Sequence, residues 1–228
     1  MTEEKIKPGY TRVSDFCSRY EDFGSVDPAY LQHRADIGTE VHAGIRGFLC
    51  DVPVILSEEA RPYFESWIEW YELIGMPAVT HEETRMYCDK WKLTGAIDGI
   101  IHFSINRAMI VDWKTSSSVD NDIWPLKGAF YHHLVGVNEL VQVAPKVLYL
   151  KLDKHGGEAV QKEYEITNYL KGMVTATMMV HRHEEKFGKD AVPEERGMIT
   201  AYKMVKDFED KVKANKKNWR TNAKDSNT

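Results

Sequence analysis

The sequence predicts an α/β (α+β) fold in which a central mixed sheet is flanked by helices. Three observations predict this fold. Hydrophobic residues have helical spacing before residue 75, short apolar strands follow from about residue 80, and helical spacing returns after residue 167. We expect a single domain over residues 1–220 and a flexible tail over 221–228. Within the domain we expect N-terminal helices at 27–75, a sheet core at 80–166 and C-terminal helices at 167–220.

The first predicted helix begins at Asp27, a good N-cap that is followed by proline at the first helical position. Gly38 is predicted to break it, with a second helix continuing to residue 49. A third helix is predicted from Ser57, which can cap it, to Gly75, which can end it.

Five later segments share apolar residues with strand spacing and polar breaks between them. We predict these strands at 84–88, 92–103, 107–114, 146–153 and 158–166. Helical segments follow the third and the fifth of these strands. We predict these helices at 121–140, 167–187 and 194–219.

The composition indicates a folded globular chain, with 43% hydrophobic and 29% charged residues among 228. No apolar run approaches the roughly 18 residues that a membrane-spanning helix needs. The first residues lack the pattern of a signal peptide, so we expect a cytoplasmic protein with no membrane partner. Three cysteines are too few for a four-cysteine iron–sulfur cluster, so none is expected.

The net charge of −5 does not by itself indicate a nucleic-acid-binding protein. Residues 203–228 nevertheless hold eight Lys/Arg against four Asp/Glu. The stretch KVKANKKNWR at 211–220 could follow phosphates, with Trp219 stacking on a base. A solvated helix face is the commoner outcome for such a stretch.

The apolar segment 95–116 contains two aspartates and a lysine, which need partners there. A hairpin with a three-residue loop at 104–106 would pair residues whose numbers sum to 210, as 98 and 112 do, and Asp98 would then face Asp112. Lys114 would share that face, and Trp113 would point to the other. A two-residue loop would shift this register by one residue.

Opposed carboxylates destabilise a hairpin unless something neutralises them, and Mg²⁺ or Mn²⁺ is the simplest candidate. Lys114 could then orient or deprotonate an attacking water. The alternative is a purely structural arrangement. In it, Asp98 forms an ion pair with Lys114, and Asp112 accepts backbone hydrogen bonds.

The order of these motifs resembles the PD-(D/E)XK nuclease superfamily, in particular its RecB-like exonuclease branch. The matching segments are GTEVH at 38–42, a glutamate at Glu82 or Glu83, GAIDGI at 95–100 and IVDWKTS at 110–116. The resemblance covers roughly residues 30–155. It implies a restriction-endonuclease-like core.

The resemblance also implies roles for individual residues. His42, Asp98, Asp112 and the backbone carbonyl of Trp113 would bind the metal, Mg²⁺ or Mn²⁺. Asp98 and Asp112 would thereby be catalytic together with Lys114, which would act on the attacking water.

Substrate contacts are implied for Glu83, Thr115, Ser116, Lys127 and Tyr131. The family often carries Q-x-x-x-Y on the helix after the last of these strands, and here Lys127 stands in the place of the glutamine. The two positions still share a helix face, and lysine can bind phosphate as a point charge.

The implied activity is metal-dependent hydrolysis of phosphodiester bonds at DNA ends or in single strands, in recombination, repair or replication. The implied partners are DNA and a recombination or replication protein, in a phage setting, with the oligomeric state left open. Two alternatives remain: a structure-specific endonuclease, and a nuclease-fold protein that binds nucleic acid or a partner without cutting.

Overall fold

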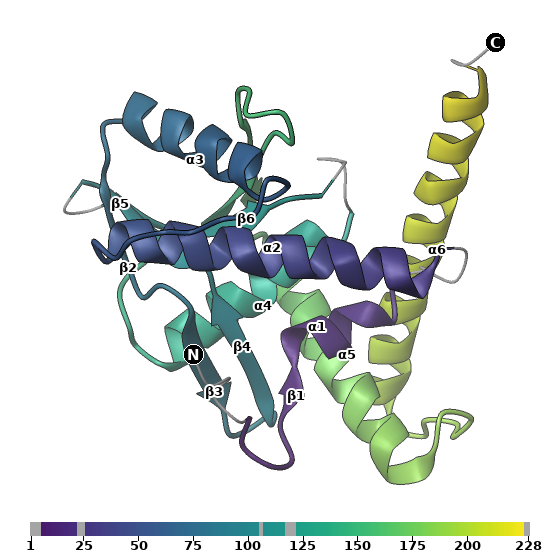
Figure 1. Cartoon of the computed structure of the whole chain (residues 1–228). Coiled ribbons are helices and arrows are strands. Elements are labelled where there is room, and N and C mark those ends of the chain that lie inside the picture. Colours follow the sequence, from purple (N-terminus) through teal and green to yellow (C-terminus); the bar gives the residue numbers. More distant parts are fainter. Residues whose placement is uncertain (1–5, 22–25, 105–106, 117–121, 226–228) are drawn as a thin grey trace.

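The computed structural model describes residues 6–21, 26–104, 107–116 and 122–225, with side chains through residue 216. It is a mixed α/β fold in which two mixed sheets are flanked by helices (Figure 1). The predicted mixed α/β class is therefore confirmed, whereas the prediction of one central sheet is wrong. Within these described ranges no helix is long and apolar enough to cross a bilayer.

The larger sheet has five strands in the order β2-β5-β6-β7-β8, and the smaller has three in the order β1-β4-β3. The larger comprises β2 (Ala78–Thr80), β5 (Gly99–Ser104), β6 (Arg107–Lys114), β7 (Lys146–Lys151) and β8 (Val160–Glu165). The smaller comprises β1 (Thr11–Arg12), β3 (Thr84–Cys88) and β4 (Leu93–Ile97). The helices are α1 (Val13–Ser18), α2 (Pro28–Leu49), α3 (Arg61–Leu73), α4 (Trp124–Val137), α5 (Asn168–Phe187) and α6 (Arg196–Asp225).

The two sheets meet at Asp98. The segment 92–103, predicted as one strand, is divided there, because β4 belongs to the smaller sheet and β5 to the larger. Most strand pairs are antiparallel, but β6 runs parallel to β7 and the two are connected through α4. A parallel pair needs such a crossover, which explains the helix between these strands.

The β5–β6 hairpin has the predicted register over most of its length. Gly99 pairs with Val111 and His102 with Ala108, so the paired numbers sum to the predicted value. At the tip Ser104 pairs with Arg107, and a bulge between residues 102 and 104 absorbs the one-residue difference. Two of the three predicted loop residues, 105 and 106, lie outside the described part of the chain.

Alternate side chains of β6 enter two different hydrophobic cores. Ile110 packs with residues of α1, α4, α5 and α6, whereas Val111 and Trp113 pack with residues of α2 and α3. In Figure 1, α3 lies above α2, whereas α4 and α5 lie below α2 and α6 runs up the right-hand edge. The end of β6 is therefore covered from both faces, and its residues have fixed positions.

Helix α2 is continuous, so the predicted break at Gly38 is wrong. The Asp27 cap is confirmed, since its Oδ1 accepts a hydrogen bond from the backbone N–H of Ala29 at 3.0 Å. A Cβ at position 38 would lie 3.2 Å from the Thr115 Oγ1. Glycine therefore serves here for close packing of α2 against the end of β6, and not for a turn.

Other helix boundaries differ by a few residues from the prediction. α3 begins at Arg61, because Ser57 caps a preceding turn, in which its Oγ accepts from the Ala60 N–H at 3.2 Å. α6 continues through Asp225, so residues 221–225 of the predicted flexible tail are helical, and 226–228 lie outside the described residues. The short elements β1, α1 and β2 were not predicted.

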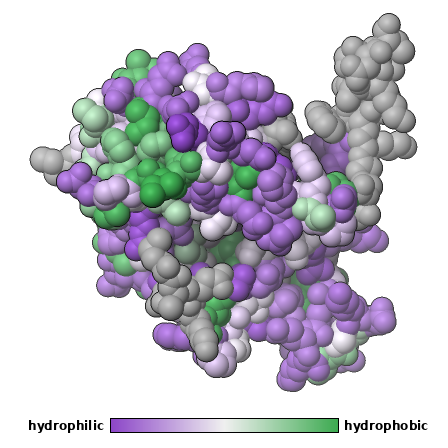
Figure 2. Space-filling view, viewed as in Figure 1, coloured by the Kyte–Doolittle hydropathy of each residue, from purple (hydrophilic) through white to green (hydrophobic). Residues whose placement is uncertain are grey.

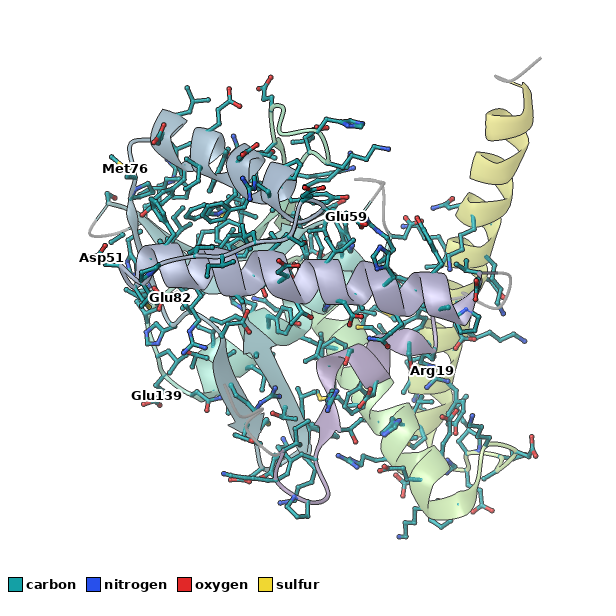
Figure 3. The ribbon with its side chains drawn as sticks, in the orientation of Figure 1. Arg19, Asp51, Glu59, Met76, Glu82 and Glu139 are labelled. Atoms are coloured by element: carbon teal, nitrogen blue, oxygen red, sulfur yellow. The ribbon has the colours of Figure 1, made fainter. Side chains whose placement is uncertain are left out.

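Ion pairs connect segments that are distant in the sequence. Arg19, labelled in Figure 3, pairs with Glu184 of α5 at 3.2 Å and with Glu209 of α6 at 3.1 Å. Glu59, also labelled there, contacts the His33 ring of α2 at 2.8 Å. These contacts attach α1 to the C-terminal helices and α2 to the segment before α3.

An apolar surface lies over the C-terminal half of α2 (Figure 2), along which residues 51–57 run back (Figure 1). Val52 is 55% exposed and Ile55 is 95% exposed. Between this segment and α2 is a pocket of about 390 Å³, lined on the helix by Glu40, Gly44 and Gly47. The pocket is separate from the polar residues at the end of β6.

Candidate metal centre

Three potential metal ligands meet where the two sheets join. They are His42 from α2, Glu83 from the turn before β3, and Asp98 from the turn between β4 and β5. One ligand atom of each lies within 4.8 Å of the others. The His42 Nδ1 is 3.4 Å from Asp98 Oδ1 and 3.5 Å from Glu83 Oε1.

The peptide groups of Trp113 hold two of these side chains in place. Its N–H donates to Asp98 Oδ2 at 2.7 Å, and its carbonyl accepts from His42 Nε2 at 3.1 Å. The Trp113 ring is fixed in turn against Trp67 and Trp70, with ring centroids 5.9 Å and 5.8 Å away. The end of β6 thus sets the orientation of the imidazole and of the carboxylate.

His42 is a cation in this arrangement. Burial opposes its charge, but the Asp98 carboxylate and then Glu83 outweigh burial and raise the pKa of His42 to about 10. Burial likewise opposes the charge of Asp98, yet His42 and then Lys114 lower the pKa of that carboxyl to about 2. Since the Trp113 carbonyl can only accept, Nε2 carries one proton and Nδ1 presents the other to the carboxylates.

Asp112 and Lys114 form a second pair beside this cluster. Their side chains make an ion pair in which Asp112 is 3% exposed. Burial raises the pKa of Asp112, and the Lys114 ammonium opposes this rise. Lys114 Nζ also lies 5.6 Å from the centroid of the Tyr149 ring, which limits where the ammonium can move.

The structure therefore brings the predicted residues together in two groups. His42 and Asp98 join Glu83, which the sequence analysis placed among the substrate contacts. Asp112 pairs with Lys114 and is not part of the cluster of three ligand atoms. The purely structural alternative has Asp98 paired with Lys114 and Asp112 accepting backbone hydrogen bonds. In the structure the two roles are exchanged: Asp98 accepts the backbone hydrogen bond and Asp112 pairs with Lys114.

Of the two candidate glutamates, Glu83 is the one at the site. It has φ +52°, in the left-handed region that is rare for a residue with a side chain and that costs free energy. Glu82, labelled in Figure 3, instead influences Tyr71. Burial and then the negative charge of Glu82 raise the pKa of the Tyr71 hydroxyl. The turn between β2 and β3 thus directs one glutamate toward His42.

The predicted substrate contacts at the end of β6 adjoin an arginine that the sequence analysis missed. Arg34 donates to the Thr115 carbonyl at 2.9 Å and to the Tyr63 hydroxyl at 2.6 Å. Ser116 follows and is exposed. Arg34 precedes His42 by about two turns of α2, which places both on nearly the same face of the helix. This spacing was the one feature of the sequence that could have indicated Arg34.

Lys127 and Tyr131 lie one turn apart on α4, as predicted. The Lys127 Nζ is 5.8 Å from the centroid of the Tyr131 ring. Burial opposes the charge of Lys127, but the Asp112 carboxylate favours it and the pKa of the lysine is raised. Burial and then the Asp112 carboxylate raise the pKa of Tyr131.

The donor set suits a hard divalent cation. Two carboxylates and one imidazole can bind Mg²⁺ or Mn²⁺, which favour oxygen ligands and retain waters. The Trp113 carbonyl, a predicted ligand, accepts a hydrogen bond from His42 here, as the partner of a metal-binding histidine commonly does.

Comparison with known protein families finds no family to which the chain can be assigned, and no curated protein matches it.

Proposed function

We propose that the protein is a metal-dependent DNA nuclease with a restriction-endonuclease-like core, acting as an exonuclease at DNA ends or on single strands. One observation carries the proposal. The Trp113 peptide connects His42 and Asp98, and the next residue is a lysine paired with a buried aspartate. A structural role alone would not require a histidine, two carboxylates and an ion pair at one buried strand end.

Mg²⁺ or Mn²⁺ would be held by His42, Glu83 and Asp98, with Asp112 beside them. When bound, such a cation supplies Lewis-acid polarisation of a phosphate oxygen and lowers the pKa of a coordinated water.

The chain's own residues have distinct tasks in this proposal. Lys114, held by Asp112, presents its ammonium to the attacking water or to a phosphate oxygen, where negative charge develops during hydrolysis. Burial of Asp112 excludes solvent, which strengthens this charge interaction. The Trp113 peptide keeps Asp98 and His42 in place, so little reorganisation is needed during the reaction.

The test is cleavage of labelled linear single-stranded and double-stranded DNA with Mg²⁺ or Mn²⁺. We expect metal-dependent cleavage by the wild type and a loss of at least about 100-fold in Lys114→Met. Lys90→Met, in the turn between β3 and β4, is the matched control and should cleave normally. Equal cleavage by wild type and Lys114→Met would refute the assignment.

Closed circular DNA separates the two modes of cutting. An exonuclease degrades linear DNA and leaves closed circles intact, whereas a structure-specific or sequence-specific endonuclease opens the circles. DNA binding without any cleavage would instead favour the non-cleaving alternative.

A further inference from the structure

Lys151, the last residue of β7, lies directly beside Lys114, the last residue of β6. The two strands run parallel, and Lys114 and Lys151 are partners in their register. Neighbouring strands lie about 4.8 Å apart, so the backbones of the two lysines are one strand spacing from each other. Lys151 therefore lies at the same end of the sheet as the residues of the proposed active site.

The side chain of Lys151 leaves the sheet on the same face as that of Lys114. Side chains alternate along a strand, and Tyr149 packs with Ile110 in the core that α4 covers, whereas Leu150 packs in the opposite core. Lys151 is two residues beyond Tyr149, just as Lys114 is four residues beyond Ile110. The Lys114 Nζ indeed lies 5.6 Å from the centroid of the Tyr149 ring. Both ammonium groups therefore belong to the α4 side of the sheet.

The backbone that follows Lys151 is held at two points. The Leu152 N–H donates to the Lys114 carbonyl at 2.8 Å, which extends the contact between the two strands by one residue. The Asp153 N–H donates at 3.0 Å to the Oγ of Ser66, which is buried in α3. Lys151 thus has a fixed backbone position, so that little beyond its own side chain must be ordered when a ligand binds.

The positive charge of Lys151 has no ion-pair partner among the residues that the structure describes. No carboxylate in those ranges lies within the 4.0 Å of an ion pair with its half-buried side chain. The carboxylate of Asp153, two residues further on, accepts hydrogen bonds from two backbone N–H groups of its own turn. Asp112 at the end of β6 already pairs with Lys114. This face therefore carries one positive charge in excess at the ends of β6 and β7.

We propose that Lys151 binds a backbone phosphate of the DNA strand, next to the phosphate at which Lys114 acts. This inference rests on the proposed nuclease function and adds a substrate contact to it. In open α/β sheets ligands bind beyond the C-terminal ends of parallel strands, and β6 and β7 form such a pair. An ammonium on a flexible stem binds phosphate as a point charge. Two lysines one strand spacing apart can thus contact successive phosphates of one strand.

The experiment measures binding of a labelled single-stranded oligonucleotide at several salt concentrations, in EDTA so that no strand is cut. Each neutralised phosphate contributes about −0.7 to the slope of log affinity against log salt for a single strand. Lys151→Gln should make this slope shallower by about 0.7 and weaken binding at low salt by about tenfold. Lys151→Met removes the same charge and should change the slope equally.

Lys146→Gln is the matched control, because it removes the same charge at the other end of β7. Lys146 pairs there with Glu163 at 3.3 Å, and five residues of strand, about 16 Å, separate it from Lys151. This variant should keep the wild-type slope. Thermal unfolding reports whether each variant is folded. Slopes in both Lys151 variants that equal those of wild type or of Lys146→Gln would overturn the inference, as would a wild type that does not bind the oligonucleotide.

The two proposals fail in different ways. If wild type cleaves DNA but the Lys151 variants bind with the wild-type slope, the nuclease assignment stands and the phosphate contact is wrong. If the slope depends on Lys151 but no divalent cation supports cleavage, the phosphate contact stands and the nuclease assignment is wrong.

Discussion

The charge on His42 predicts how strongly pH controls metal binding. Its pKa is about 10 in the metal-free protein, because Asp98 and Glu83 outweigh the opposing effect of burial. An imidazole must be neutral to bind a metal, so a cation that binds through His42 Nδ1 has to displace one proton. Protons and metal ions therefore compete for the same nitrogen.

The size of the effect follows from that pKa. At any pH well below about 10, the unprotonated fraction of His42 falls tenfold for each unit by which the pH falls. Between pH 8 and pH 6 the apparent Kd for Mn²⁺ should therefore rise about 100-fold, which is about 3 kcal/mol. Because the pKa of His42 is raised, a fall in pH weakens metal binding.

Titration calorimetry with Mn²⁺ at pH 6, 7 and 8, in buffers of different ionisation enthalpy, measures both the affinity and the protons released. We expect about one proton released per metal ion near pH 7. His42→Gln should bind more weakly and lose most of the pH dependence, whereas His33→Gln, at a surface pair, should match wild type. A wild-type affinity that does not change between pH 6 and pH 8 would refute the reasoning.

Two further predictions concern positions with matched controls. Glu83→Gln should weaken Mn²⁺ binding by about 10- to 100-fold in the same calorimetry, while Glu82→Gln should not; equal effects would contradict the assignment of Glu83. Gly136→Ala in α4, where a Cβ meets open space, should stabilise the protein by up to about 1 kcal/mol in urea unfolding. Gly38→Ala should give no such gain, because its Cβ would crowd Thr115; a gain equal to that of Gly136→Ala would show that this contact is unimportant.

The hairpin register could be predicted because side chains alternate with period two and the turn is short. Asp98, Asp112 and Lys114 were placed near one another on that basis. Their pairing could not be predicted. Which aspartate contacts Lys114 depends on the turn at Asp98 between two sheets, and on the Trp113 N–H that this turn brings within reach.

Other differences also have physical causes. Gly38 was predicted to break a helix because glycine is a poor helix former, yet the tertiary contact with Thr115 favours it there. Glu82 and Glu83 are equivalent in sequence, and only the positive φ of Glu83 distinguishes them. Elements as short as β1, which has two residues, carry no detectable periodicity.

The most direct test of the metal site is a crystal of the protein soaked in Mn²⁺, with the metal located by its anomalous scattering. We expect a peak about 2.0 to 2.6 Å from oxygens of Asp98 and Glu83 and from His42 Nδ1, adjacent to the Asp112–Lys114 pair. A peak elsewhere, or none at concentrations that saturate binding in solution, would contradict it.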